Sequence, residues 1–317
     1  MSTDTCVWNK LFDDNERTAL QDGFTAGGLI SVILSAWLNL TLLVSNLRHD
    51  RSYNNLANFT LAACIRRIVP VMAHLPFIKY IESLYGLQEQ FCEFFAFMET
   101  FLAVFEVECL THVCIERYVL AKYTTNGWTI KDNHYTFFLY LCVFFSVLYS
   151  YPPLIGLGHY GFDFSCTSCT FDMVLPDVAW QRYVVVIIFA LRSIKPVIFM
   201  VMMLIWARIL ETKENSNLEI THRNSRFTRN VIAVTVVNLV CWTPIALIRG
   251  WVVFSYLVYI DPLDVISALF IKWAMWIHWI SPSMTVVTLL VVDDRLRSHM
   301  IYFSTTNDSD KENIKDE

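Results

Sequence analysis

Seven apolar stretches, each long enough to cross a lipid bilayer as a helix, constrain this 317-residue chain more than any other feature. A helix needs about 20 mostly apolar residues to span the hydrocarbon core of a bilayer. The stretches cover residues 24–47, 54–77, 89–121, 134–154, 182–210, 226–256 and 263–291. The connections between them are short and polar, and none has the length of a second soluble domain. We therefore expect an all-α membrane protein, a bundle of seven transmembrane helices.

The composition agrees with a lipid-embedded chain. Hydrophobic residues make up 55% of the sequence and charged residues only 17%, whereas a soluble domain of this size needs more polar surface. The net charge of −5 argues against nucleic acid as a partner. The nine cysteines include no Cys-x-x-Cys pair and no Cys/His spacing typical of zinc, so no metal site is predicted. No set of nucleophile, base and orienting residue is evident either, and we expect no enzyme.

The distribution of positive charge predicts the orientation in the membrane. Most of the 24 lysines and arginines fall in segments that face the cytoplasm if the N-terminus is outside, and only four would face outward: Lys10, Arg17, Lys79 and Arg182. Residues 1–23 are then an extracellular N-terminus, and residues 24–303 form the seven-helix bundle, ending in a short amphipathic helix over residues 293–303. Residues 304–317 are polar throughout and should form a disordered cytoplasmic tail.

Two short motifs occupy the third and sixth stretches. Glu116-Arg117-Tyr118 ends the third, and the sixth contains Cys241-Trp242-Thr243-Pro244. Together they resemble the E/DRY and CWxP motifs of rhodopsin-like G-protein-coupled receptors. The resemblance implies a multi-pass receptor of the plasma membrane that binds a small molecule outside and a heterotrimeric G protein inside.

A closer resemblance is to opsins, over residues 28–297. It is carried by Pro-Pro-Leu-Ile-Gly at 152–156, by Ser-Cys-Thr-Phe-Asp at 168–172 and by Arg-Phe-Thr-Arg at 226–229. It implies a disulfide from Cys92 to Cys169 in the second outer loop, with Cys166 as the alternative partner. Opsin-like serpentine receptors of nematodes are similar, and their chemosensory use implies a sensory cell, with the cilium as a candidate location.

The resemblance also implies an activation switch. Its members would be Glu116, Arg117, Tyr118, Trp242, Pro244 and Pro282. Arg117 would pair with Glu116 at rest and turn to the G protein on activation, whereas the alternative is an interfacial arginine that snorkels to water. Pro244 removes a backbone hydrogen bond and should bend its helix, with Trp242 either coupling ligand shape to that bend or simply filling the core.

Other parts of the usual family pattern are absent from the sequence. Ser281-Pro282 replaces the seventh-helix NPxxY motif, and Thr285 stands where the tyrosine would be. Asn224 replaces the acid that usually begins the sixth helix. Coupling to a G protein could therefore be altered, and the basal activity raised.

Ionisable residues at membrane depth are costly and point to a binding site. Glu99 lies two helical turns below Cys92, where the resemblance implies contact with a ligand. Ala103, Trp242, Arg249 and Lys272 complete the predicted site, and Arg192 and Lys195 are further cations at this depth. The alternative for Glu99 is an internal ion pair with Lys272 or Arg249 and no ligand. Arg66 and Arg67 would pair with Glu106 or line a wet cavity.

Two functions remain open at this point. The first is a chemoreceptor for a diffusible small molecule, without a cofactor. The alternative is a photoreceptor that attaches retinal to Lys272, with Asp163 or Glu99 as the counterion. Lys272 lies ten residues before Pro282 whereas opsins place the lysine seven before it, so Met275 takes that register. A remote third reading is a proton transporter that uses His112, His278 and the buried glutamates. No feature of the sequence sets an oligomeric state.

Overall fold

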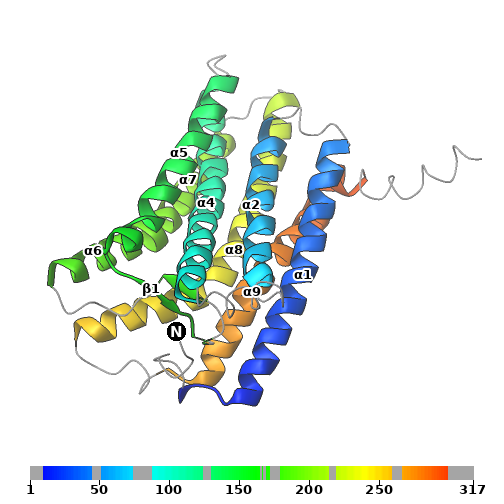
Figure 1. Ribbon diagram of the computed structural model, residues 1–317. Helices are drawn as coiled ribbons and strands as arrows, with labels where there is room; N and C mark the ends of the chain where they lie inside the picture. The colour runs from blue at the N-terminus through cyan, green and yellow to red at the C-terminus, as the bar shows by residue number, and fades with distance from the viewer. Residues whose placement is uncertain are drawn as a thin grey trace, which may run out of the picture.

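The structure is a computed structural model and consists of a bundle of long helices (Figure 1). It describes residues 10–44, 51–73, 88–123, 130–164, 166, 169–171, 179–213, 219–258 and 266–298. Three consecutive segments, α6, η6 and α7, form one continuous rod, so the described residues make seven long helices. The predicted seven-helix bundle is thereby confirmed. The helices are α1 (Asp14–Val44), α2 (Arg51–Ala73), α4 (Gln88–Tyr123), α5 (Asp132–Ser150), α6 (Ala179–Phe189), the π-helical η6 (Ala190–Ile194), α7 (Lys195–Lys213), α8 (Glu219–Leu257) and α9 (Ala268–Val292).

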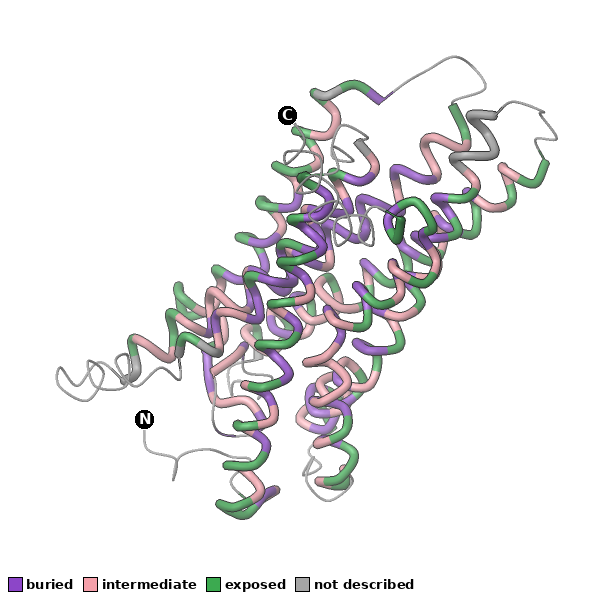
Figure 2. Tube along the Cα trace, turned by 90° about the vertical axis from the view of Figure 1, so that its right-hand side faces the viewer, coloured by how far each residue is buried: buried purple, intermediate pink, exposed green. Residues whose placement is uncertain are grey.

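Large apolar side chains cover the outside of the bundle. Figure 2 shows exposed residues along the outer faces of the helices and buried residues between them. Tyr140, Val291 and Ile33 are each more than 60% exposed. A surface so apolar is unfavourable in water and suits lipid. Among the described residues, four helical stretches are long and apolar enough to cross a membrane by length and composition alone: Asp14–Val44, Trp180–Lys213, Ser225–Leu257 and Ala268–Val292.

Helix α1 begins ten residues before the predicted start of the first span. Asp13 and Glu16 form a reciprocal cap there: the Glu16 amide donates to Asp13 Oδ1 at 2.7 Å and the Asp13 amide to Glu16 Oε2 at 3.4 Å. Further along, Gly23 meets the Trp276 ring of α9 so closely that a Cβ would lie 2.3 Å from it. The segment expected as an extracellular N-terminus is therefore in part a helix packed on α9.

The fourth span is shorter than the sequence predicted. Helix α5 ends at Ser150, and Pro152–Ile155 form the 3₁₀ turn η5. The proline pair explains the difference: Tyr151 still has helical backbone angles, but Pro152 and Pro153 have no N–H with which to continue the hydrogen bonds of α5. Beyond it, β1 (Tyr160–Phe162) pairs antiparallel with β2 (Cys169–Phe171) next to the start of α4. We call this end of the bundle, where α1 also begins, the outer end and the opposite one the inner end, after the orientation that the sequence predicts (Figure 1).

The rod formed by α6, η6 and α7 has a π-helical segment at its centre. The Lys195 amide donates to the carbonyl of Ala190, five residues back. Pro196 explains the irregularity, since it has no N–H to donate to the carbonyl of Arg192 and its ring crowds that carbonyl. One inserted residue rotates α6 by about 100° relative to α7 and brings Arg192 to a new direction.

Two apolar cores stack along the bundle. The outer one includes Phe171, Val252 and Met275, and the inner one includes Leu110 and Leu289. The described part of the expected amphipathic helix is residues 294–298, which are helical with Leu296 buried. The rest of that helix and the tail predicted at 304–317 lie outside the described residues.

Candidate functional site

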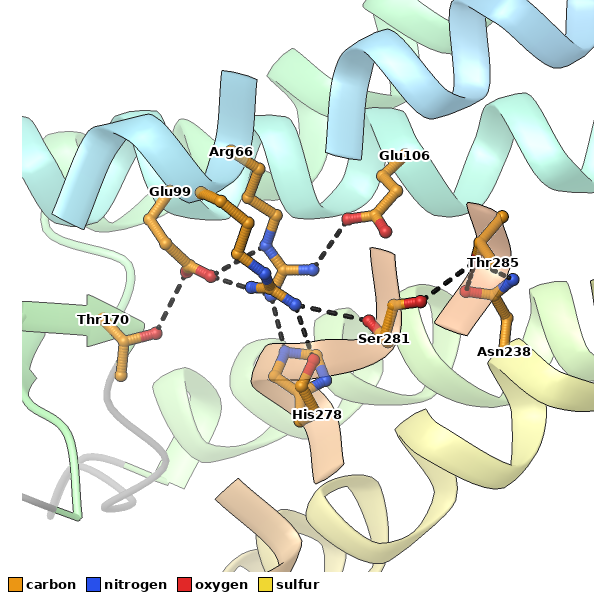
Figure 3. A network of polar contacts seen from close by, with 9 residues as sticks. Arg66, Glu99, Glu106, Thr170, Asn238, His278, Ser281 and Thr285 are labelled. Atoms are coloured by element: carbon orange, nitrogen blue, oxygen red, sulfur yellow. Dashed lines mark hydrogen bonds and ion pairs between the residues drawn. The ribbon is translucent and has the colours of Figure 1, made fainter. Parts of the chain in front are cut away.

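A buried network of charged side chains links α2, α4 and α9 in the outer half of the bundle (Figure 3). Arg66 is at its centre. Its Nε and Nη2 donate to Glu99 Oε1 at 3.1 and 2.9 Å, and its Nη1 donates to Glu106 Oε2 at 2.9 Å. The His278 ring nitrogen Nε2 lies 2.8 Å from Arg66 Nη2. The predicted contact of this arginine pair with Glu106 is thus confirmed for Arg66.

Arg67 lies on the other side of His278. Its Nη2 donates to the His278 carbonyl at 2.6 Å and to Ser281 Oγ at 3.3 Å, and its guanidinium lies 5.0 Å above the Trp279 ring. The Ser281 carbonyl accepts from Thr285 Oγ1, which in turn accepts from Asn238 Nδ2. Figure 3 shows this path of polar contacts running from the charge network to α8.

The network changes what Glu99 can do. Its Oε1 already accepts two bonds from Arg66, so its charge is largely satisfied in a region where charges are expensive to bury. Its other oxygen, Oε2, accepts from Thr170 Oγ1 of β2 at 3.4 Å. Glu99 therefore joins α2 to the outer hairpin, and the predicted ion pair of Glu99 with Lys272 is absent from the described residues.

Lys272 lies elsewhere, at the outer end of α9. Its Nζ donates to Glu16 Oε1 of α1 at 3.0 Å, and its ammonium lies 5.8 Å above the Phe12 ring. The side chain is 31% exposed. Met275, in the register of the opsin lysine, is buried in the outer core. The structure thus does not bring Lys272 together with Glu99.

The other predicted ligand residues lie closer to the network. Ala103 is buried on α4, one turn below Glu99. Trp242 is buried in the inner core, and its Nε1 has no partner among the described residues. Arg249 of α8 lies near enough to Glu99 and Asp163 for their charges to act on it. Lys195 instead pairs with Glu108 at 2.5 Å, between α7 and α4.

The disulfide predicted from the resemblance is confirmed. Cys92 at the outer end of α4 is bonded to Cys169 of β2, with their Cα atoms 5.5 Å apart. Cys166, the alternative partner for Cys92, is disulfide-bonded as well. The next residue, Thr170, is the one that reaches Glu99, so the covalent link holds the hairpin on the charge network.

At the inner end, Glu116 and Arg117 form a buried ion pair, with Arg117 only 2% exposed. This exposure excludes the snorkelling alternative. Glu116 also accepts from Ser52 Oγ at 2.8 Å, from Asn55 Nδ2 at 2.6 Å and from the Tyr135 hydroxyl at 3.2 Å.

Arg117 makes two further contacts that hold it between α2 and α8. It donates to Ser52 Oγ at 2.5 Å, and its guanidinium lies 4.6 Å above the Phe227 ring. Neutral donors on α2 and α5 therefore hold the pair, and no described side chain of α8 supplies a carboxylate to it.

Other polar contacts join α8 to its neighbours near the same end. Thr228 Oγ1 donates to Glu211 Oε1 of α7 at 2.6 Å, and Arg208 Nη1 donates to Ser225 Oγ at 3.0 Å. Buried Asp293, just after α9, accepts from the Tyr53 hydroxyl at 2.7 Å and from Asn230 Nδ2 at 3.0 Å. These contacts were not predicted from the sequence. Asn224, where the family's acid is missing, has no described side chain.

A seven-helix bundle with an outer hairpin held by a disulfide and a buried Glu-Arg pair at its inner end defines the seven-transmembrane receptor class. The sequence model of the family described as 7 transmembrane receptor (rhodopsin family) matches residues 39–285. The chain therefore belongs to the rhodopsin family of seven-transmembrane receptors.

Known relatives of this chain include opsins. Opsin-5 of Mus musculus is 24% identical over 182 residues, which cover 52% of this chain and 46% of that protein. Rhodopsin of Psalidodon fasciatus is 26% identical over 167 residues (51% and 47%), and the GQ-coupled rhodopsin of Mizuhopecten yessoensis is 25% identical over 190 residues (55% and 38%). The chain spans about half the length of these curated relatives.

The crystal structure of squid rhodopsin has the same fold. Its TM-score is 0.73 at 13% identity, over 92% of this chain and 85% of that one. At that identity the likeness establishes the fold alone.

Proposed function

We propose that this protein is a plasma-membrane receptor that passes a signal from a small molecule on its outer side to a heterotrimeric G protein on its inner side. The observation that carries the proposal is the buried Glu116–Arg117 pair at the inner end of α4, held by neutral donors from α2 and α5. Such a pair can be released by a modest helix shift, because its further partners within the described part of the chain are neutral hydrogen-bond donors. One relative is a GQ-coupled rhodopsin, which supports a G protein as the partner.

The structure suggests a route between the two ends. Polar contacts run from Arg67 through Ser281 and Thr285 to Asn238, one turn below Trp242 on the proline-containing helix α8. A ligand that moves the outer charge network would change contacts along this path. Pro244 and Pro282 weaken the backbone ladder of α8 and α9 close to it. Helix α8 is therefore the element that we expect to move.

The test measures guanine-nucleotide exchange on a panel of purified G proteins, with the receptor in lipid nanodiscs. Asn55→Ala removes a donor from Glu116 and should raise basal exchange several-fold, while Tyr140→Phe, on the lipid-facing surface, should leave it unchanged. If neither the unchanged receptor nor Asn55→Ala promotes exchange on any G protein above an empty nanodisc, the proposal fails.

A ligand that is not attached covalently agrees best with the position of Lys272. A retinal Schiff base needs a lysine in a dry interior, and Lys272 is a third exposed and bonded to Glu16. The photoreceptor function remains the second candidate because the relatives are opsins. Incubation with 11-cis-retinal distinguishes the two: a visible absorbance band that Lys272→Ala abolishes would establish the photoreceptor, and a flat spectrum would leave the diffusible ligand.

A further inference from the structure

Positive charge is in excess in the outer half of the bundle. Arginine side chains are charged at any physiological pH, so each one buried at membrane depth calls for a counter-charge. Arg66 has two carboxylate partners, which leaves none of the nearby intramembrane carboxylates for the remaining arginines. The charged side chains at this depth are four arginines and two glutamates: Arg66, Arg67 and Glu106 are buried, and Arg192, Arg249 and Glu99 are partly buried.

Arg192 and Arg249 are the two arginines without a partner. Within the ranges that the structure describes, neither makes a hydrogen bond or an ion pair, and Arg192 Nη1 is buried and unpartnered. The two lie where α6 packs on α8, since a Cβ on Gly250 would be 3.2 Å from the Phe189 ring, and their charges repel each other. Both are attracted to Glu99, and Arg249 also to Asp163, but Glu99 already accepts two bonds from Arg66, and neither arginine makes an ion pair with either carboxylate among the described residues.

The backbone conformation sets the direction of the Arg192 side chain. It lies within the π-helical segment η6, and an uninterrupted helix through this point would turn its side chain by about 100°. Irregular segments of this kind are frequent at functional sites. The π-helical segment brings the unpaired charge of Arg192 toward that of Arg249, and this repulsion destabilises the ligand-free protein. A bound anion would reverse the destabilisation.

We propose that the ligand is an organic acid whose carboxylate binds between Arg192 and Arg249, an inference that rests on the proposed receptor function. Guanidinium groups bind carboxylates through two parallel hydrogen bonds, and the strength of such a pair grows where water is excluded. The side chains of Ile188 and Ile248, one turn or less from the two arginines, belong to the outer apolar core. The body of the acid is therefore apolar.

The test uses the full chain, purified and placed in nanodiscs of uncharged phosphatidylcholine lipid. Hexanoate, octanoate and benzoate are added, each beside its own amide as an uncharged control of equal shape. At least one acid should raise the melting temperature by about 2–4 °C more than its amide, through preferential binding to the folded state. Arg192→Gln and Arg249→Gln should each abolish the difference, and Arg192→Lys should retain part of it because the charge remains.

The two outcomes that overturn the inference are distinct. Amides that stabilise as much as their acids, or inorganic phosphate that does so, show that no carboxylate site exists. A difference that persists in both glutamine variants places the site elsewhere. Neither readout involves a G protein, so a receptor that binds the acid but drives no nucleotide exchange would contradict the proposed function and leave the site intact.

A measurement without any ligand checks the same point. In the ligand-free receptor, Arg192→Gln and Arg249→Gln should each raise the melting temperature, because each removes one of two repelling charges. Arg66→Gln should lower it, because it leaves Glu99 and Glu106 without their shared partner. If the two glutamine variants lower the melting temperature as far as Arg66→Gln does, both arginines are structural and the inference is wrong.

Discussion

The two ends of the bundle treat buried charge in opposite ways. At the inner end each buried acid has its partners: Glu116 pairs with Arg117 and accepts from Ser52, Asn55 and Tyr135, and Asp293 accepts from Tyr53 and Asn230. At the outer end, four arginines share two glutamates. A balanced charge pair can hold a resting conformation by itself, whereas an unbalanced group needs something from outside the chain. The contrast supports our proposals that the inner end holds the resting state and that the outer end recognises the ligand.

The largest expected effect comes from removing a carboxylate from the outer network, which already has more arginines than glutamates. Glu106→Gln takes away one of the two carboxylates that pair with buried Arg66 and raises the positive excess further. We expect a loss of about 3–5 kcal/mol in the free energy of unfolding, the usual effect of removing one partner of a buried pair. Thermal unfolding of the purified receptor measures it. A loss below about 1 kcal/mol would mean that water reaches Arg66.

The disulfide offers the next largest effect. Cys169→Ser opens a loop of 77 residues in sequence and frees the hairpin that carries Thr170 to Glu99. We expect a destabilisation of about 2–4 kcal/mol, together with weaker binding of any acid found to stabilise the receptor. Cys64→Ser, a substitution of a buried free cysteine, is the matched control. If Cys169→Ser and Cys64→Ser weaken acid binding equally, the hairpin has no specific part in ligand recognition.

At the inner end, Tyr135→Phe removes one hydrogen bond to the Glu116 carboxylate. Bonds to charged groups contribute about 1.5–3 kcal/mol, so the resting state should weaken and basal nucleotide exchange should rise. Exchange that stays constant while the melting temperature falls would show that this contact supports the fold and not the resting state.

The smallest expected effect sharpens the outer boundary of the network. Lys272→Gln removes a partly exposed ion pair with Glu16, for which we expect less than about 1 kcal/mol. A loss comparable to that of Glu106→Gln would show that Lys272 acts inside the network and would reopen its role in ligand binding.

The sequence predicted the architecture well because its signals are local. The seven apolar lengths and the two motifs, Glu116-Arg117-Tyr118 and Cys241 to Pro244, can be read along one chain. The Cys92–Cys169 pairing followed from the resemblance to opsins, which left Cys166 as the alternative. The outer charge network was predicted only in fragments. Whether Glu99 pairs with Arg66, Arg249 or Lys272 depends on the relative rotation and depth of different helices, which apolar periodicity leaves open.

Two local features, a π-helical segment and a helix cap, account for the direction of Arg192 and for the Glu16–Lys272 contact, neither of which was predicted from the sequence. The π-helical segment before Pro196 sets the direction of Arg192, and a uniform helical period does not contain it. The cap formed by Asp13 and Glu16 starts α1 early and brings Glu16 within reach of Lys272. The acidic cluster at the start of α1 was a readable signal for that cap, since capping boxes occur at helix N-termini.

The length of α1 has one more consequence. Its 31 residues extend about 46 Å, whereas the hydrocarbon layer is about 30 Å thick. The first turns therefore stand among lipid headgroups and ions, and the contact between Glu16 and Lys272 is open to electrolyte. Salt should weaken the Glu16–Lys272 ion pair and leave the interior contacts of Arg66 and Arg67 largely unchanged. Raising the ionic strength is therefore a way to loosen the packing of α1 on α9 at the outer end without disturbing the centre of the bundle.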